Sequence, residues 1–148
     1  MHRIINQIGI NLIKQFEGFR SAVYICSGGH PTIGFGHKLL PHEKYLTISI
    51  SYAEKLLVKD LIKAEKSVMN CITSHLTDNQ FAALVSFTFN VGGAALQRSS
   101  LRQKINYGNF IECNDEFPKW IYAGGRRIPG LIKRRNAERD LFFDGLNY

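Results

Sequence analysis

Apolar residues recur with two different spacings along the 148-residue chain. Intervals of three and four residues predict helices over about 4–17, 51–71, 80–91, 100–107 and from 131 onward. Residues 22–37 instead combine two β-prone runs with a Gly-rich turn, which predicts a hairpin or a small antiparallel sheet. The pattern therefore predicts an α+β protein that is predominantly helical, with its β element near the start.

Cap-forming residues predict where these helices begin and end. Gly18 is expected to end the first helix, and Ser51-x-x-Glu54 and Thr77-x-x-Gln80 have the pattern of capping boxes that begin the second and third. The other expected boundaries are an end at Gly92-Gly93, a start at Ser99 or Ser100 with a stop at Gly108, a short helix at Asn109-x-x-Glu112 before Pro118, and a last helix after Pro129-Gly130.

The net charge and the cysteine content limit which partners and which structural classes are expected. Nineteen Lys and Arg against twelve Asp and Glu give a net charge of +7, which favours a polyanionic partner: nucleic acid, anionic membrane or an acidic wall polymer. No apolar run approaches the ~18 residues of a membrane span, and Met1–Gln7 lacks a continuous apolar region, so we expect neither a transmembrane segment nor a signal peptide. The odd cysteine count argues against a disulfide framework, and Cys71 and Cys113 are expected to be inert thiols.

Glu17 is singled out by its position. It is expected to be the last residue before Gly18 and to lie just ahead of the Gly-rich hairpin, where a helix end can form one wall of a cleft. Desolvation on an apolar surface favours the neutral form of a carboxyl group, which suits a general acid. From position alone, a solvated Glu in a last helical turn is the simpler interpretation.

The residues around Glu17 change that balance. Phe16-Glu17-Gly18-Phe19-Arg20, followed by Thr-Ile-Gly-Phe-Gly-His at 32–37, resembles the opening of phage-type lysozymes, the small muramidase endolysins of glycoside hydrolase family 24. Members of that family carry a Glu, then Asp or Cys nine residues later, then Thr fifteen residues later; these positions are Glu17, Cys26 and Thr32 here. Similar stretches at 79–92, 99–101 and 131–138 extend the resemblance over nearly the whole chain.

The resemblance implies a lysozyme-like, two-lobed fold in a single catalytic domain over residues 1–148. A small lobe of about 18–55 would hold the antiparallel sheet. A long bridging helix would lead into a helical lobe of about 56–148, which also packs the N-terminal helix. The active-site cleft would lie between the lobes.

The resemblance also implies hydrolysis of the β-1,4 bond between N-acetylmuramic acid and N-acetylglucosamine in bacterial peptidoglycan, and so lysis of a host cell. Such cleavage needs a proton for the leaving oxygen and a stabilised oxocarbenium-like centre that water attacks. We expect Glu17 to be the general acid in a single displacement with inversion, with the water held by Thr32 and Cys26. A neutral thiol would stabilise the cation less than a carboxylate would, and Cys26 as a thiolate base or in a covalent adduct stays an alternative.

Further residues enter through the resemblance alone. His37 is expected to be structural, paired with a carboxylate on the bridging helix. Arg134 is expected to form an ion pair with Glu17, which would favour the carboxylate against the effect of desolvation. Phe89, Asn90 and Ser100 match positions that line the saccharide cleft, with packing and helix capping as the alternative.

Metal binding and the stacking of aromatic rings on sugars have weaker support in the sequence. Cys26, His30 and His37 match no usual zinc spacing, so we expect no metal and no cofactor. Three aromatic residues could stack on sugars, although core packing is the commoner use: Tyr24, Phe35 and Trp120.

Three rival functions remain open from the sequence. The basic residues concentrated near the C-terminus could give weak contact with anionic membrane. Nucleic-acid binding has no recognised motif to support it, and we expect none. A glycan-binding relative without catalysis is disfavoured because Glu17 and Thr32 are both present. By family analogy we expect a monomer that stays in the host cytoplasm until a holin releases it to the wall.

Overall fold

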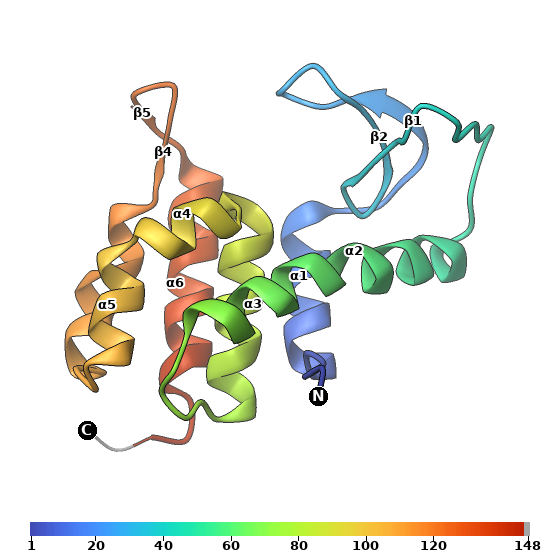
Figure 1. Ribbon diagram of the computed structural model, residues 1–148. Coiled ribbons are helices and arrows are strands. Elements are labelled where there is room, and N and C mark those ends of the chain that lie inside the picture. The colour runs from blue at the N-terminus through green and yellow to red at the C-terminus, as the bar shows by residue number, and fades with distance from the viewer. Residues whose placement is uncertain (147–148) are drawn as a thin grey trace.

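The computed structural model describes residues 1–146, which form a mainly helical body with a small sheet at one end (Figure 1). The α-helices within this range are α1 (Gln7–Glu17), α2 (Ile50–Cys71), α3 (Asp78–Val91), α4 (Gly93–Arg98), α5 (Ser100–Asn106) and α6 (Pro129–Phe143). The strands are β1 (Arg20–Ile25), β2 (Pro31–Gly34), β3 (His37–Lys38), β4 (Tyr122–Ala123) and β5 (Arg126–Arg127). Two 3-10 turns, Ile111–Asp115 and Phe117–Lys119, precede β4. The predicted fold class, α+β and predominantly helical, is confirmed.

The N-terminal sheet is antiparallel with the strand order β1-β2-β3, as the sequence predicted for residues 22–37 with one strand added. β2 lies in the middle, so Thr32 faces Tyr24 on one neighbouring strand and Lys38 on the other. The register slips between Arg20 and Tyr24, as at a β-bulge. This pairing places Tyr24, Thr32 and Lys38, one residue from each strand, next to one another.

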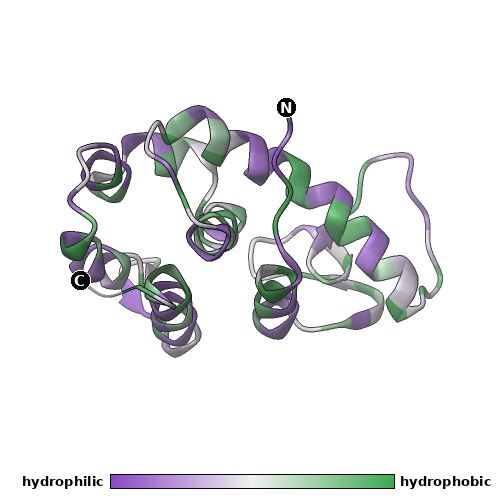
Figure 2. Cartoon of the chain, turned by 90° about the horizontal axis from the view of Figure 1, so that it is seen from below, coloured by the Kyte–Doolittle hydropathy of each residue, from purple (hydrophilic) through white to green (hydrophobic). Residues whose placement is uncertain are grey.

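α2 connects the sheet to the helical lobe (Figure 1). Its expected apolar stripe is buried throughout: Ala53, Leu57, Leu61, Ala64 and Val68. Polar and apolar residues alternate along the helix (Figure 2), as they do when one face packs and the other meets water. The predicted bridging helix is therefore confirmed.

α3 is the centre of the helical lobe, and residues 80–88 are buried on every side. It packs against α1, α2 and α6. Its contact with α1 is very close: a Cβ on Gly9 would lie 2.8 Å from the Cβ of Ala82. This close approach fixes α1, and with it the residue at the end of α1, against the lobe.

Two predicted helix starts are wrong by two or three residues. α1 begins at Gln7 rather than near residue 4, because the Asn6 side chain accepts the amide N–H of Gly9 and caps the helix there. Ile5 keeps its place in the apolar pattern because it is buried in extended chain, with its amide donating to Glu65. α2 is capped by Ser49 rather than by Ser51.

Other boundaries match. The Thr77–Gln80 capping box is present with both reciprocal hydrogen bonds. Gly92 ends α3 as expected, although Gly93 then begins α4, a helix the sequence did not predict. Ser99 caps α5, which ends at Asn106, two residues before Gly108.

The region before the last helix differs from the prediction. The short helix expected to begin at Asn109 is replaced by the two 3-10 turns, and neither turn is capped by a side chain. β4 and β5 form a second, unpredicted hairpin after them. α6 begins at Pro129, so Pro129 and Gly130 are its first residues rather than a preceding turn. None of the helices in residues 1–146 is long and apolar enough to cross a membrane.

Candidate active site

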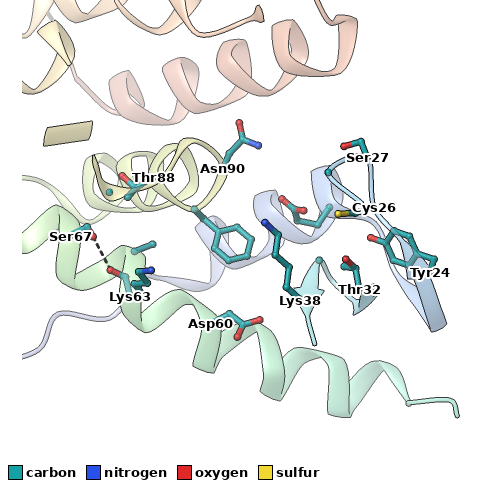
Figure 3. A pocket seen from close by; sticks show the side chains of 17 residues that line it. Tyr24, Cys26, Ser27, Thr32, Lys38, Asp60, Lys63, Ser67, Thr88 and Asn90 are labelled. Carbon is teal, nitrogen blue, oxygen red and sulfur yellow. Dashed lines mark hydrogen bonds between the residues drawn. The ribbon is translucent and has the colours of Figure 1, made fainter. Parts of the chain in front are cut away.

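A cleft of about 600 Å³ opens between the sheet and the helical lobe (Figure 3). Its walls come from the end of α1, the three N-terminal strands, one face of α2 and the α3–α4 junction. The lining residues are Glu17, Tyr24, Cys26, Ser27, Gly28, Thr32, Gly36, Lys38, Asp60, Lys63, Ala64, Ser67, Thr88, Phe89, Asn90, Gly92 and Gly93. The structure thus brings Glu17, Cys26 and Thr32 to one cleft.

Glu17 is the last residue of α1, and its side chain is 22% exposed. Its Oε2 accepts a hydrogen bond from Nη1 of Arg134 at 2.7 Å. Its Oε1 lies over the backbone of Gly36, where a Cβ would come within 2.7 Å. Gly36 also has a φ of 77°, a conformation that glycine adopts readily. The carboxyl group is therefore held between an arginine and a bare stretch of backbone.

Arg134 is itself fixed by a buried network. Its Nε donates to Oε2 of Glu138 at 3.1 Å, and its Nη2 donates to the carbonyl oxygen of Ser86 at 3.0 Å. The hydroxyl of Ser86 donates to Glu138 at 2.6 Å, and Arg135 binds the other Glu138 oxygen. Burial raises the pKa of Glu138, while the two guanidinium groups and the hydroxyl oppose the rise. The predicted Arg134–Glu17 pair is present and rests on charges inside the protein core.

Cys26 lies in the turn after β1, partly exposed, and its amide donates to the carbonyl oxygen of His30 at 3.0 Å. Hydrogen bonding to the backbone at His30 lowers the pKa of the Cys26 thiol most, followed by that to Thr32, and the charge of Lys38 adds to the effect. Thr32 is buried on β2, and its hydroxyl donates to the same His30 carbonyl at 2.8 Å. In this arrangement the hydroxyl oxygen can accept a hydrogen bond from a water, and it stabilises a Cys26 thiolate when it donates to the sulfur instead.

His37 pairs with a carboxylate of the bridging helix, as expected. Its Nδ1 lies 2.7 Å from Oδ2 of Asp60 on α2, and its Nε2 lies 2.9 Å from Oε1 of Glu43. Burial opposes the charged imidazole, but the hydrogen bonds with Asp60 and Glu43 raise the pKa of His37. Burial likewise opposes a charged Glu43, but the Leu40 amide, His37 and Tyr45 lower its pKa to about 2. These contacts join the sheet to α2.

The candidate sugar contacts divide into two groups. Phe89 and Asn90 line the cleft, and the Asn90 side-chain oxygen accepts from Arg135. Ser100 is not among the cleft residues in the described chain, and its hydroxyl donates to the buried Glu116. Among the aromatic candidates, Tyr24 lines the cleft.

Phe35 and Trp120 take the core alternative instead. The ring centroid of Phe35 lies 5.5 Å from that of Phe19. The ring of Trp120 lies edge-on to Phe87. Neither is among the cleft residues in the part of the chain that the structure describes.

Several cleft residues were not predicted from the sequence. The helical offsets of Asp60, Lys63 and Ser67 place them on one face of α2, but nothing local shows that this face meets a cleft. Lys38 directly follows His37, so its position next to the Gly-Phe-Gly-His motif was a sequence signal that it lies near the cleft. Thr88 has a buried hydroxyl oxygen to which residues 1–146 offer no hydrogen-bond partner.

Comparisons with known proteins agree with this geometry. An endolysin of Bacillus phage B103 is 44% identical over 95% of this chain and 54% of its own length. An endolysin of Salmonella phage P22 is 35% identical over 93% of this chain and 97% of its own. The chain spans about half the length of the Bacillus phage relatives, of which a second is from phage PZA.

Solved structures show the same fold. An endolysin from Escherichia coli O157:H7 phage FAHEc1 superposes with a TM-score of 0.88, 32% identity, and coverage of 100% of this chain and 98% of that one. The muramidase domain of SpmX from Asticaccaulis excentricus gives a TM-score of 0.86 at 34% identity, covering 96% and 98%. The family model described as phage lysozyme matches residues 14–138, which include the α1 end, the sheet, the bridging helix and Arg134. The chain belongs to the phage lysozyme family.

Proposed function

We propose that this chain hydrolyses the β-1,4 bond between N-acetylmuramic acid and N-acetylglucosamine in bacterial peptidoglycan, and so lyses a host cell. One observation carries the proposal. The Glu17 carboxyl group is fixed by Arg134 at 2.7 Å in the same cleft that Cys26 and Thr32 line. Membership of the phage lysozyme family supports the substrate class.

In the proposed reaction, Glu17 is protonated and gives its proton to the glycosidic oxygen as that bond breaks. Positive charge then develops at the sugar carbon, and a water attacks from the opposite face. Lone pairs of the Thr32 hydroxyl orient this water, and the Cys26 thiolate takes its proton. Hydrogen bonding to the His30 backbone and to Thr32 lowers the pKa of the Cys26 thiol, which is the direction that favours a general base. Single displacement by water inverts the configuration at the sugar carbon.

The test compares wild type, Glu17→Gln and the matched control Glu112→Gln on purified, lipid-stripped peptidoglycan. Glu112 is an acid outside the cleft, paired with Lys104 at 3.6 Å. Wild type and control should clear the suspension and leave reducing N-acetylmuramic acid ends. Glu17→Gln should lose about 10²- to 10⁴-fold in rate, the usual contribution of a general acid. Anhydro-muramic ends, or equal rates for wild type and Glu17→Gln, would contradict the proposal.

The roles of Cys26 and of inversion have separate tests. NMR of the first product should show the α-anomer, because inversion converts a β-linkage; a β-anomer would contradict single displacement. Alkylation should abolish activity in wild type but not in Cys26→Asp, where a carboxylate replaces the thiol. Unchanged activity after complete alkylation of wild type would remove Cys26 from the mechanism.

By analogy with endolysins, we also propose a monomer that accumulates in the host cytoplasm and depends on a holin to reach the wall. Production of the chain in a bacterial host should then cause lysis only when a holin or another membrane-permeabilising agent is added. Lysis without any such agent would contradict this dependence.

A further inference from the structure

Four charged side chains line the cleft: Glu17, Lys38, Asp60 and Lys63. Both acids already have a basic partner, because Glu17 pairs with Arg134 and Asp60 pairs with His37. Neither lysine forms an ion pair with any residue in the described range 1–146. The cleft therefore presents two ammonium groups that form no ion pair within residues 1–146.

These ammonium groups come from two elements that pack together, β3 and α2. Lys38 faces Thr32 across the strand pair and points into the space between the walls (Figure 3). Lys63 lies one helical turn after Asp60, and its carbonyl oxygen accepts from the hydroxyl of Ser67 at 3.1 Å. Both lysines are exposed, so a bound molecule can reach them.

Peptidoglycan offers the complementary charge. Each muramyl group bears a lactyl side chain that leads into a stem peptide, and the second stem residue, D-glutamate, carries either a free carboxylate or an amide. A free carboxylate and an ammonium group form a charge-assisted hydrogen bond, whereas an amide does not carry the charge. Clefts that present charge of one sign attract ligands of the opposite charge.

We propose that Lys63, together with Lys38, selects wall strands whose stem peptides carry a free carboxylate over strands in which that group is amidated. The inference rests on the proposed muramidase function and names the substrate class of the same cleft. Lys63 is the specificity-determining residue to test first, because Lys38 also lowers the pKa of Cys26, after the His30 backbone and Thr32, and so affects the reaction itself.

The experiment measures kcat/KM on two soluble glycan strands of equal length, one with free D-glutamate carboxylates and one with amides. Wild type should prefer the free form by roughly two- to fivefold, as expected for one solvent-exposed ion pair. Lys63→Gln should bring the ratio close to one, whereas Lys63→Arg should keep it. Lys55→Gln is the matched control, since Lys55 is an exposed lysine of the same helix outside the cleft.

Ratios are used because a general loss of activity or stability cancels between the two substrates. A ratio that Lys63→Gln leaves unchanged would overturn the inference, as would an equal fall in Lys55→Gln, which would indicate only long-range surface charge. A wild type that cleaves both strands at equal rates would overturn the inference while leaving the proposed function intact. A wild type that forms no new reducing ends on either strand contradicts the proposed function, and the inference falls with it.

Discussion

Two charged networks border the cleft, and they are built from different chemistry. The acid network lies behind Glu17 and consists of Arg134, Arg135, Glu138 and Ser86, all buried in the helical lobe. The histidine network joins the sheet to α2 through His37, Asp60 and Glu43. The first depends on guanidinium groups that stay charged at all working pH values, whereas the second depends on an imidazole that titrates. The contrast predicts that the position of Glu17 does not depend on pH, whereas one of the contacts between the sheet and α2 does.

The largest expected effect comes from breaking the acid network. Arg134→Met leaves Glu138 buried with one guanidinium fewer and leaves Glu17 without its partner. Removing one partner of a buried pair costs about 3–5 kcal/mol, so the free energy of unfolding should fall by that amount, and activity with it. Urea titration checks the fall, with Lys133→Met on the exposed side of α6 as the control. Equal stability of the two variants would contradict the network's role.

The histidine network should make the free energy of unfolding depend on pH. Because folding raises the pKa of His37 above its ordinary 6.5, its contribution is complete below pH 6.5 and is lost as the pH rises through the folded value. Because folding lowers the pKa of Glu43 from 4.5 to about 2, its contribution is present above pH 4.5 and is lost as the pH falls toward 2.

Thermal unfolding over pH 2–9 measures both limbs. His37→Gln should flatten the upper limb, and Glu43→Gln should flatten the acid limb, with each variant losing about 1–3 kcal/mol at pH 6. If His37→Gln retains the full decline of wild type at high pH, the titration belongs to another group.

A smaller effect is expected at Gly36, whose backbone contacts Glu17 and which directly precedes His37. Gly36→Ala would place a Cβ 2.7 Å from Oε1 of Glu17 and would strain a backbone with φ of 77°. Gly125→Ala is the matched control, because Gly125 has the same φ and no atom within 4 Å of the added Cβ. Both variants should lose about 1–2 kcal/mol from left-handed strain, but Gly36→Ala alone should also lose activity on peptidoglycan. Equal activity of the two would mean that Glu17 does not need this backbone.

Features that depend on neighbours within one helical turn were predictable from the sequence, whereas features that depend on tertiary contacts were not. The Thr77–Gln80 capping box was predicted correctly because both partners lie within one helical turn. The start of α2 was wrong because Ser49 and Ser51 both suit a cap, and Glu54, the expected partner of Ser51, pairs instead with Lys14 on α1. Local pattern does not distinguish such choices when tertiary contacts decide them.

The residues of the cleft also divide into those that were predictable from the sequence and those that only tertiary packing brings together. The spacing of Glu17, Cys26 and Thr32 and the position of Arg134 were available through family resemblance, and the structure places all four as expected in the cleft or against Glu17. The contact of the Glu17 carboxyl group with the backbone of Gly36 was not predictable, because it depends on how α1 meets the sheet. The cleft lysines Lys38 of β3 and Lys63 of α2 were not predicted for the same reason, since only the packed lobes bring them together.

The central claim is that Glu17 gives a proton to the leaving oxygen. The most direct measurement compares wild type and Glu17→Gln on two muropeptide oligomers that differ only in the leaving group, one a natural sugar and the other 4-nitrophenolate. The phenolate leaves without a proton, so Glu17→Gln should lose about 10²- to 10⁴-fold in rate on the natural bond and retain most of its rate on the activated one. An equal loss on both substrates would contradict the assignment of Glu17 as the general acid.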